Sequence, residues 1–143
     1  MKTESTLKIL FLLAVVSIFL PWFTYDPELM GYCWGWQFLK WLLLPMFMIG
    51  SYLFTDVRNI IVFIATELCM VVNLAVLVIA FGRWQEVCHM IGGYHWEDGF
   101  PTAQPGYWIS VVVFSALAVV LQYDLIKNLI KRKSWMEKQE KAE

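Results

Sequence analysis

Four long runs of mostly apolar residues are separated by shorter polar segments along the chain. The runs cover residues 7–23, 36–54, 60–81 and 107–123. A helix needs about 17–25 predominantly apolar residues to cross the hydrocarbon core of a membrane, so each run is long enough to do so. The pattern predicts an all-α integral membrane protein in which residues 1–124 form a bundle of four transmembrane helices.

The positively charged residues predict how this bundle is oriented. Four spans place both termini on one side of the membrane, and that side carries nine of the eleven Lys and Arg residues. Lys40 and Arg83 fall on the other side. Because Lys and Arg accumulate in cytoplasmic segments, we expect both termini in the cytoplasm. We expect a bacterial inner (cytoplasmic) membrane, with the first helix as an uncleaved signal anchor because no small-residue cleavage site follows it.

Composition agrees with a membrane protein and excludes several other classes. Of the 143 residues, 59% are hydrophobic and 16% are charged, and the mean hydropathy is +0.58. Soluble domains carry about 45–50% apolar and about 25% charged residues. The sequence has no polar stretch long enough for a soluble catalytic domain. It also lacks the basic composition of a nucleic-acid-binding domain and the cysteine density of a small secreted module.

Aromatic residues are concentrated on the expected outer side of the membrane. Seven of the eight tryptophans lie there, whereas an ordinary aromatic belt occupies both interfaces. Interface anchoring explains Trp36, at the start of a span, better than it explains Trp34, Tyr94 and Trp96, which lie within loops. Because Trp and Tyr often dominate binding surfaces, we expect the two outer loops to form a small aromatic-rich cap that recognises a partner through these four residues.

Two of the three cysteines lie in the outer loops, Cys33 in the first loop and Cys88 in the second. The outer face of a bacterial inner membrane is oxidising, so we expect a disulfide between them that joins the two loops. The alternative is two unpaired, small hydrophobic side chains. Cys69 lies inside the third span and is expected to be a small buried residue.

One cluster in the second outer loop has the residue types of a metal site. Glu86 and His89 are three residues apart, so they can share a helix face, and His95 follows in the same loop. These side chains can ligate zinc, but their spacing matches no metal signature. They are therefore weak metal candidates, and the favoured interpretation is that they are polar residues at the rim of the loop. The sequence also lacks a phosphate-binding loop and a nucleophile elbow. It predicts a non-enzymatic protein with no cofactor.

The third span carries polar residues that are costly inside a membrane. Glu67 lies roughly 10 Å from the start of that span, where a charged carboxylate costs about 2.5–3.5 kcal/mol. Thr66 and Asn73 are seven residues apart and share one helix face, from which Glu67 is displaced. The candidate partners on other helices are Ser51, Ser115 and Gln122. Either Glu67 and Asn73 hold helices together through hydrogen bonds, or Glu67 lines an ion path with Thr66, Asn73 and Gln122 nearby.

Residues 125–143 form a basic tail after the last span. Apolar residues alternate with cationic ones in a helical spacing, which predicts an amphipathic helix that continues out of the fourth span. The cations in this spacing are Lys127, Lys131, Arg132 and Lys133. A solvated tail that obeys the positive-inside rule explains them, and the alternative is docking on anionic lipid or on a cytoplasmic partner.

These features favour a non-enzymatic membrane protein that acts as an oligomeric or partner-bound sensor or accessory subunit. Two alternatives stay open. One is a homo-oligomeric ion pore that uses Glu67. The other is an immunity-type protein directed against a membrane-active toxin. The expected partners are membrane lipid and either a second copy of the chain or another membrane or cytoplasmic protein, but no nucleic acid.

Overall fold

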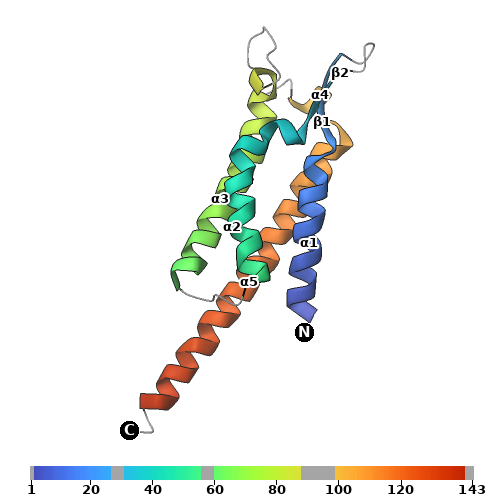
Figure 1. Ribbon diagram of the computed structural model, residues 1–143. Helices are drawn as coiled ribbons and strands as arrows, with labels where there is room; N and C mark the ends of the chain where they lie inside the picture. The colour runs from blue at the N-terminus through green and yellow to red at the C-terminus, as the bar shows by residue number, and fades with distance from the viewer. Residues whose placement is uncertain (1, 27–30, 56–59, 88–98, 141–143) are drawn as a thin grey trace.

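A computed structural model of the chain describes residues 2–26, 31–55, 60–87 and 99–140. Within these ranges the chain forms helices and one small β-sheet (Figure 1). In chain order the elements are α1 (Lys2–Ile18), β1 (Pro21–Asp26), β2 (Gly31–Trp34), the 3-10 helix η1 (Gly35–Phe38), α2 (Leu39–Phe54), α3 (Ile60–Val87), α4 (Gly99–Thr102) and α5 (Pro105–Glu140).

Four long helices, α1, α2, α3 and α5, lie side by side and form a bundle. The most extensive helix contacts join α1 to α5 and α2 to α3, while α1 and α2 touch much less although they are neighbours in sequence. The β-hairpin and α4 sit on one end of the bundle, and α5 projects far beyond the other end (Figure 1). The N-terminus lies at the same end as the projecting part of α5.

Three segments are long and apolar enough to cross a membrane, as expected of an integral membrane protein. They are Gly35–Phe54, Ile61–Val87 and Pro105–Asn128. Their outward faces are strongly apolar: Leu44 and Phe47 on α2 each expose 70% of their surface. Side chains of this kind would be unfavourable in water along a whole bundle, whereas lipid accommodates them.

The core of the bundle is formed by the opposite faces of the same helices. Leu42 and Ile49 of α2 and Phe114 and Leu117 of α5 are fully buried. In α5 the spacing of three residues between these two positions follows the helical repeat, which keeps one stripe turned inward. Within the described residues, α2 and α5 thus carry buried apolar side chains on one face and exposed apolar side chains on the other, as expected of helices in a membrane bundle.

The first helix differs from the predicted span of residues 7–23. It runs from Lys2 to Ile18, and its last turn tightens, with the N–H of Leu20 donating to the carbonyl of Ser17 at 3.2 Å. Pro21 lacks an N–H donor and cannot continue a helix, so the chain turns into β1 there. α1 has 17 residues, and of the four long helices only α2, with 16 residues, is shorter.

The third and fourth predicted spans are helices, as expected, but both helices extend beyond the predicted bounds. α3 continues to Val87, six residues past the predicted end of the third span, and departs from helical geometry at Arg83 (φ −132°, ψ 18°). α5 begins at Pro105, where a proline fits the first turn of a helix, and runs to Glu140. Residues 125–140 of the predicted tail are therefore a direct continuation of the last span.

The first outer loop contains a β-hairpin, where the sequence indicated only turns. β1 and β2 are antiparallel, with Phe23 opposite Cys33 and Thr24 opposite Tyr32, and two irregularities interrupt the register. Phe23 also pairs with Ala103, which ties the hairpin to the segment just before α5. The hairpin therefore rests on the ends of α1 and α5 rather than standing free.

Candidate functional site

A hydrogen-bonded polar pair lies between α3 and α5, inside the segments that could cross a membrane. The amide Nε2 of Gln122 donates to the carboxylate Oε2 of Glu67 at 2.8 Å. Gln122 is exposed and Glu67 is half-buried, so the pair lies on the flank of the bundle. Of the partners proposed from the sequence, Gln122 is thus the one that Glu67 contacts.

A shallow groove of about 350 Å³ surrounds this pair. Besides Glu67 and Gln122, its lining is apolar and includes Val71 on α3, together with Ala118 and Val119 on α5. Val71 and Val119 are both mostly exposed. We call this groove, with its polar pair, the α3–α5 seam. It combines a carboxylate, an amide and an apolar surface that no other described helix covers.

Thr66 and Asn73 lie on a different face of α3 from Glu67. Both are fully buried in the bundle. The Thr66 hydroxyl donates to the carbonyl of Val62 at 2.7 Å, which satisfies it within its own helix. Asn73 Nδ2 lies 3.7 Å from the sulfur of Met46 on α2, and among the described residues no partner is found for its Oδ1. The polar residues expected as one set are therefore divided between the seam and the core.

A second polar cluster, which the sequence analysis did not single out, joins α2 to α5 at the end away from the hairpin. The hydroxyl of Tyr52 donates to Oδ2 of Asp124 at 3.1 Å, and Asn128 Nδ2 donates to the same oxygen at 3.0 Å. The spacing of Asp124 and Asn128, four residues apart on a helix, could have indicated this cluster. These two hydrogen bonds join its three members, so the cluster links α2 to α5.

The opposite end of the bundle is closed by packed aromatic rings. Trp22 stacks on Phe38 with ring centroids 5.3 Å apart, and Phe23 stacks on Trp84 at 5.4 Å. Tyr107 contacts both Trp22 and Phe23. The Trp22 indole donates to the Ser17 carbonyl at 3.1 Å, so even its polar atom is satisfied in the interior. Trp22 ends the predicted first span together with Phe23, yet it is part of the core.

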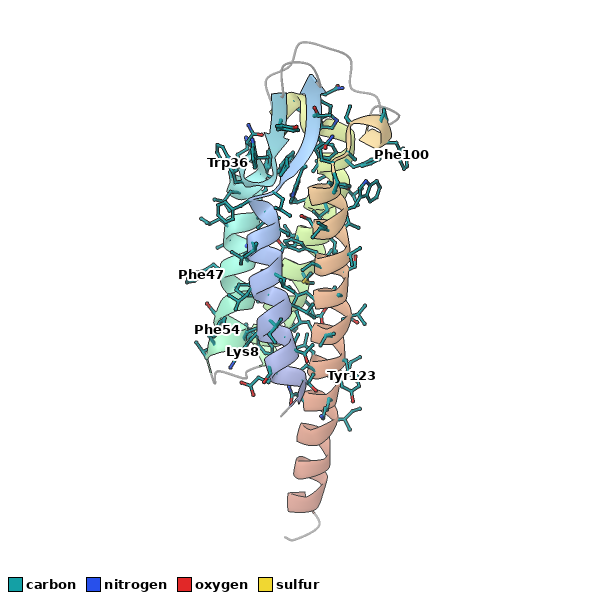
Figure 2. The ribbon with its side chains drawn as sticks, turned by 90° about the vertical axis from the view of Figure 1, so that its right-hand side faces the viewer. Lys8, Trp36, Phe47, Phe54, Phe100 and Tyr123 are labelled. Carbon is teal, nitrogen blue, oxygen red and sulfur yellow. The ribbon has the colours of Figure 1, made fainter. Side chains whose placement is uncertain are left out.

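The four aromatic residues expected to recognise a partner are placed only in part. Trp34 exposes 38% and Trp36 exposes 50% of its surface, and Figure 2 shows Trp36 beside the hairpin. The backbone N–H of Trp34 donates to the side chain of Gln37 at 2.9 Å, which orders the turn into η1. Tyr94 and Trp96 lie outside the described residues.

Two of the three cysteines lie among the described residues, and their surroundings differ. Cys33, in β2, is fully buried, with its sulfur 3.9 Å from the carbonyl oxygen of Trp84. Cys69 on α3 is free. Cys88 lies outside the described residues, so its bond with Cys33 stays a prediction.

The weak metal candidates are not brought together in the part of the chain that can be described. Glu86 forms an ion pair with Arg83 at 2.6 Å, and His89 and His95 lie outside the described residues. Among the described residues, no group of three or more His, Cys, Asp or Glu side chains could hold a metal ion.

Of the four tail cations predicted to contact lipid or a cytoplasmic partner, one has a described side chain. Lys127 Nζ lies 6.0 Å from the ring centroid of Tyr123, one turn earlier on α5. Lys131, Arg132 and Lys133 lie on the helical backbone of α5, and their side chains are outside the described set.

Comparison with known proteins adds no relationship to this picture. No protein-family model, no curated protein sequence and no solved structure matches the chain.

Proposed function

We propose that this chain is a non-enzymatic subunit of a membrane complex and associates with a neighbouring protein through the α3–α5 seam. The observation that carries the proposal is the position of the Glu67–Gln122 pair on the flank of the bundle. A charged carboxylate in a membrane costs about 2.5–3.5 kcal/mol, and a single amide donor leaves most of its acceptor sites open. A neighbouring helix that supplies further donors and excludes lipid would offset this cost.

We further propose that α1 is a fourth span and that both termini are cytoplasmic. α1 packs along α5 and exposes apolar side chains such as Ile9 and Val16 outward. Lys8, near its start, lies 5.5 Å from the ring centroid of Phe54 at the far end of α2 (Figure 2). The excess of Lys and Arg at this end supports the cytoplasmic assignment, and a bacterial inner membrane is the proposed location.

In this arrangement the outer end would be the sensing or recognition surface. Its support is a rigid base: the hairpin rests on stacked rings, while Trp34 and Trp36 are exposed above them. We propose that Tyr94 and Trp96 extend this surface and that a Cys33–Cys88 bond holds the two loops together. The basic helix of residues 125–140 would then contact anionic lipid or a cytoplasmic partner.

Cysteine cross-linking at the seam tests the proposal. In a Cys69→Ala background, Val71→Cys and Val119→Cys place thiols in the seam, and Leu44→Cys places one on the exposed face of α2 as a matched control. We expect oxidation in native membranes to cross-link the two seam variants but not the control. The mass of the adduct then distinguishes a second copy from another subunit.

A matched pair of substitutions adds a chemical test. Glu67→Leu should weaken the cross-link at Val119→Cys, because it removes the group that needs a polar neighbour, whereas Leu68→Ile, one position further along α3, should leave it unchanged. Cross-linking that is absent at the seam, or that is equally strong at Leu44→Cys, would refute association through this surface.

An ion pore built from several copies is the second candidate. Because Glu67 lies on the flank of one copy, an assembly that turns the α3–α5 seam inward would form a ring of carboxylates, as cation pores do. Cation flux into proteoliposomes tests this reading. Glu67→Gln should abolish the flux of a pore, and a variant that assembles and conducts like the wild type would exclude it.

A further inference from the structure

A cavity of about 460 Å³ lies between α2 and α3 at the end of the bundle that carries the β-hairpin. Its lining includes the apolar side chains of Phe38, Val76 and Ile79, together with Lys40 and Arg83. Ligand pockets in proteins commonly have volumes of about 300–1,000 Å³. The cavity thus joins an apolar interior to a cationic edge where the two helices reach the outer end of the bundle.

The distribution of charge along the chain makes this edge unusual. Lys and Arg are disfavoured at the outer ends of spans, and nine of the eleven in this chain follow that rule. The two exceptions are Lys40, the second residue of α2, and Arg83, near the end of α3. They are more than forty residues apart in sequence, yet both line the same cavity.

The edge retains positive charge after its internal ion pair is counted. Arg83 pairs with Glu86 at 2.6 Å, which neutralises one cation. Lys40 Nζ lies 4.1 Å from the ring centroid of Trp41, which orients the amine, and among the described residues it has no carboxylate partner. The described part of the cavity therefore carries one net positive charge, beside apolar walls within the membrane-spanning segments.

We propose that this cavity binds an anionic phospholipid of the outer leaflet. The phosphate would lie between Lys40 and Arg83, where it can accept charge-assisted hydrogen bonds from both, and an acyl chain would pack on Val76 and Ile79. An interfacial Trp such as Trp41 suits the headgroup level. The proposal does not depend on association at the α3–α5 seam, and the proposed orientation serves only to name the leaflet.

A second groove in the same molecule can be compared with this cavity. A larger groove of about 630 Å³ lies between α1 and α2, lined by side chains such as Phe11, Phe47 and Phe54. Lys8, whose Nζ lies 5.5 Å from the centroid of the Phe54 ring, already pairs with Glu4 at 2.8 Å. No cation is found among the described residues that line this groove, so it can hold acyl chains but should not discriminate between headgroups.

Native mass spectrometry of the purified full chain in detergent tests the proposal. The probe is an equimolar mixture of dioleoyl phosphatidylglycerol, which is anionic, and dioleoyl phosphatidylcholine, which is zwitterionic. We expect the wild type to retain one phosphatidylglycerol in preference to phosphatidylcholine. Lys40→Gln and Arg83→Gln should each reduce that preference about fivefold, since one cation near a phosphate contributes that much.

Two further variants separate the site from general effects of charge or folding. Lys8→Gln removes a cation at the other end of the bundle and should leave the preference unchanged. Ile79→Trp fills the cavity while keeping both cations and should reduce the amount of retained phosphatidylglycerol. Equal retention of both lipids by the wild type would overturn the proposal. So would an unchanged preference in the Lys40→Gln/Arg83→Gln double variant.

Discussion

Two glycines determine how closely the hairpin can sit on the helix ends. A Cβ atom at Gly35 would overlap the indole of Trp22 and lie 2.6 Å from the carbonyl oxygen of Ile18. A Cβ at Gly106 would overlap the carbonyl oxygen of Pro21. In both places backbone atoms block the added group, so the neighbours cannot move aside without displacing β1 from the bundle.

Alanine at either position is therefore expected to destabilise the protein. Overpacking against fixed atoms costs about 1–3 kcal/mol, so Gly35→Ala and Gly106→Ala should lower the melting temperature in detergent. Gly50→Ala is the control, because its Cβ would meet only the tip of the Phe11 ring, at 3.0 Å. Size-exclusion chromatography after heating measures the surviving fraction. Equal losses for all three variants would argue against this tight packing.

Asn73 is a buried amide whose oxygen has no partner among the described residues, and its replacement by leucine is expected to stabilise the protein. Asn73→Leu keeps a similar volume and removes the cost of an unpaired buried group, so the protein should gain about 1 kcal/mol in unfolding free energy. Asn73→Ala removes volume as well and should be destabilising. The same heating assay compares the two. A loss of stability in Asn73→Leu would show that the amide has a partner that only the assembled protein supplies.

Some side-chain contacts could be predicted from the sequence, because polar side chains inside a membrane are costly and therefore stand out. Glu67 and Gln122 are conspicuous within apolar runs, which made Gln122 one of three predicted partners of Glu67. The burial of Trp22 could not be predicted in this way. A tryptophan at the end of an apolar run is equally compatible with an interface anchor, and its burial depends on β1 folding back over it.

At the scale of elements, hydropathy located the helices but not the hairpin. The run of residues 7–23 is continuous in apolarity, although its last three residues belong to β1. Burial under a small sheet and burial in lipid select the same residue types, so hydropathy cannot separate them. Pro21 was the available indication, because a proline at that point ends the preceding helix.

The proposed bond between the loops can be tested by reduction. Cys33→Ser and Cys88→Ser should each lower the unfolding free energy by about 2–4 kcal/mol, because a cross-link restricts the unfolded chain. Reductant should bring the wild type down to the level of Cys88→Ser and leave that variant unchanged. Cys69→Ala is the control, since Cys69 is free. Full alkylation of both outer thiols in the unfolded, unreduced protein would contradict the bond.

At the scale of the whole molecule, α5 is much longer than a membrane is thick. Its 36 residues extend about 54 Å at 1.5 Å per residue, against about 30 Å for the hydrocarbon core. The excess projects from the end of the bundle that carries the N-terminus (Figure 1). Residues 125–140 therefore extend beyond the bundle as a continuous part of α5.

The proposed orientation predicts the behaviour of reporter fusions. Green fluorescent protein should fluoresce at both termini, and alkaline phosphatase should be inactive at both, because the proposed orientation places both ends in the cytoplasm. A thiol introduced by Trp36→Cys should react with a membrane-impermeant reagent from outside the cell. An active phosphatase at the N-terminus alone would mean that α1 does not cross the membrane.

The pairing of α1 with α5 determines the order in which the bundle can be assembled during synthesis. The 86 residues between Ile18 and Pro105 take roughly 4–17 seconds to translate at about 5–20 residues per second. Until then α1 lacks its main partner, and the hydroxyl of Ser110, which donates to the carbonyl of Ser17 at 3.2 Å, has not yet been made. The first helix therefore gains its most extensive helix contact only when α5, the last helix to be synthesised, completes the bundle.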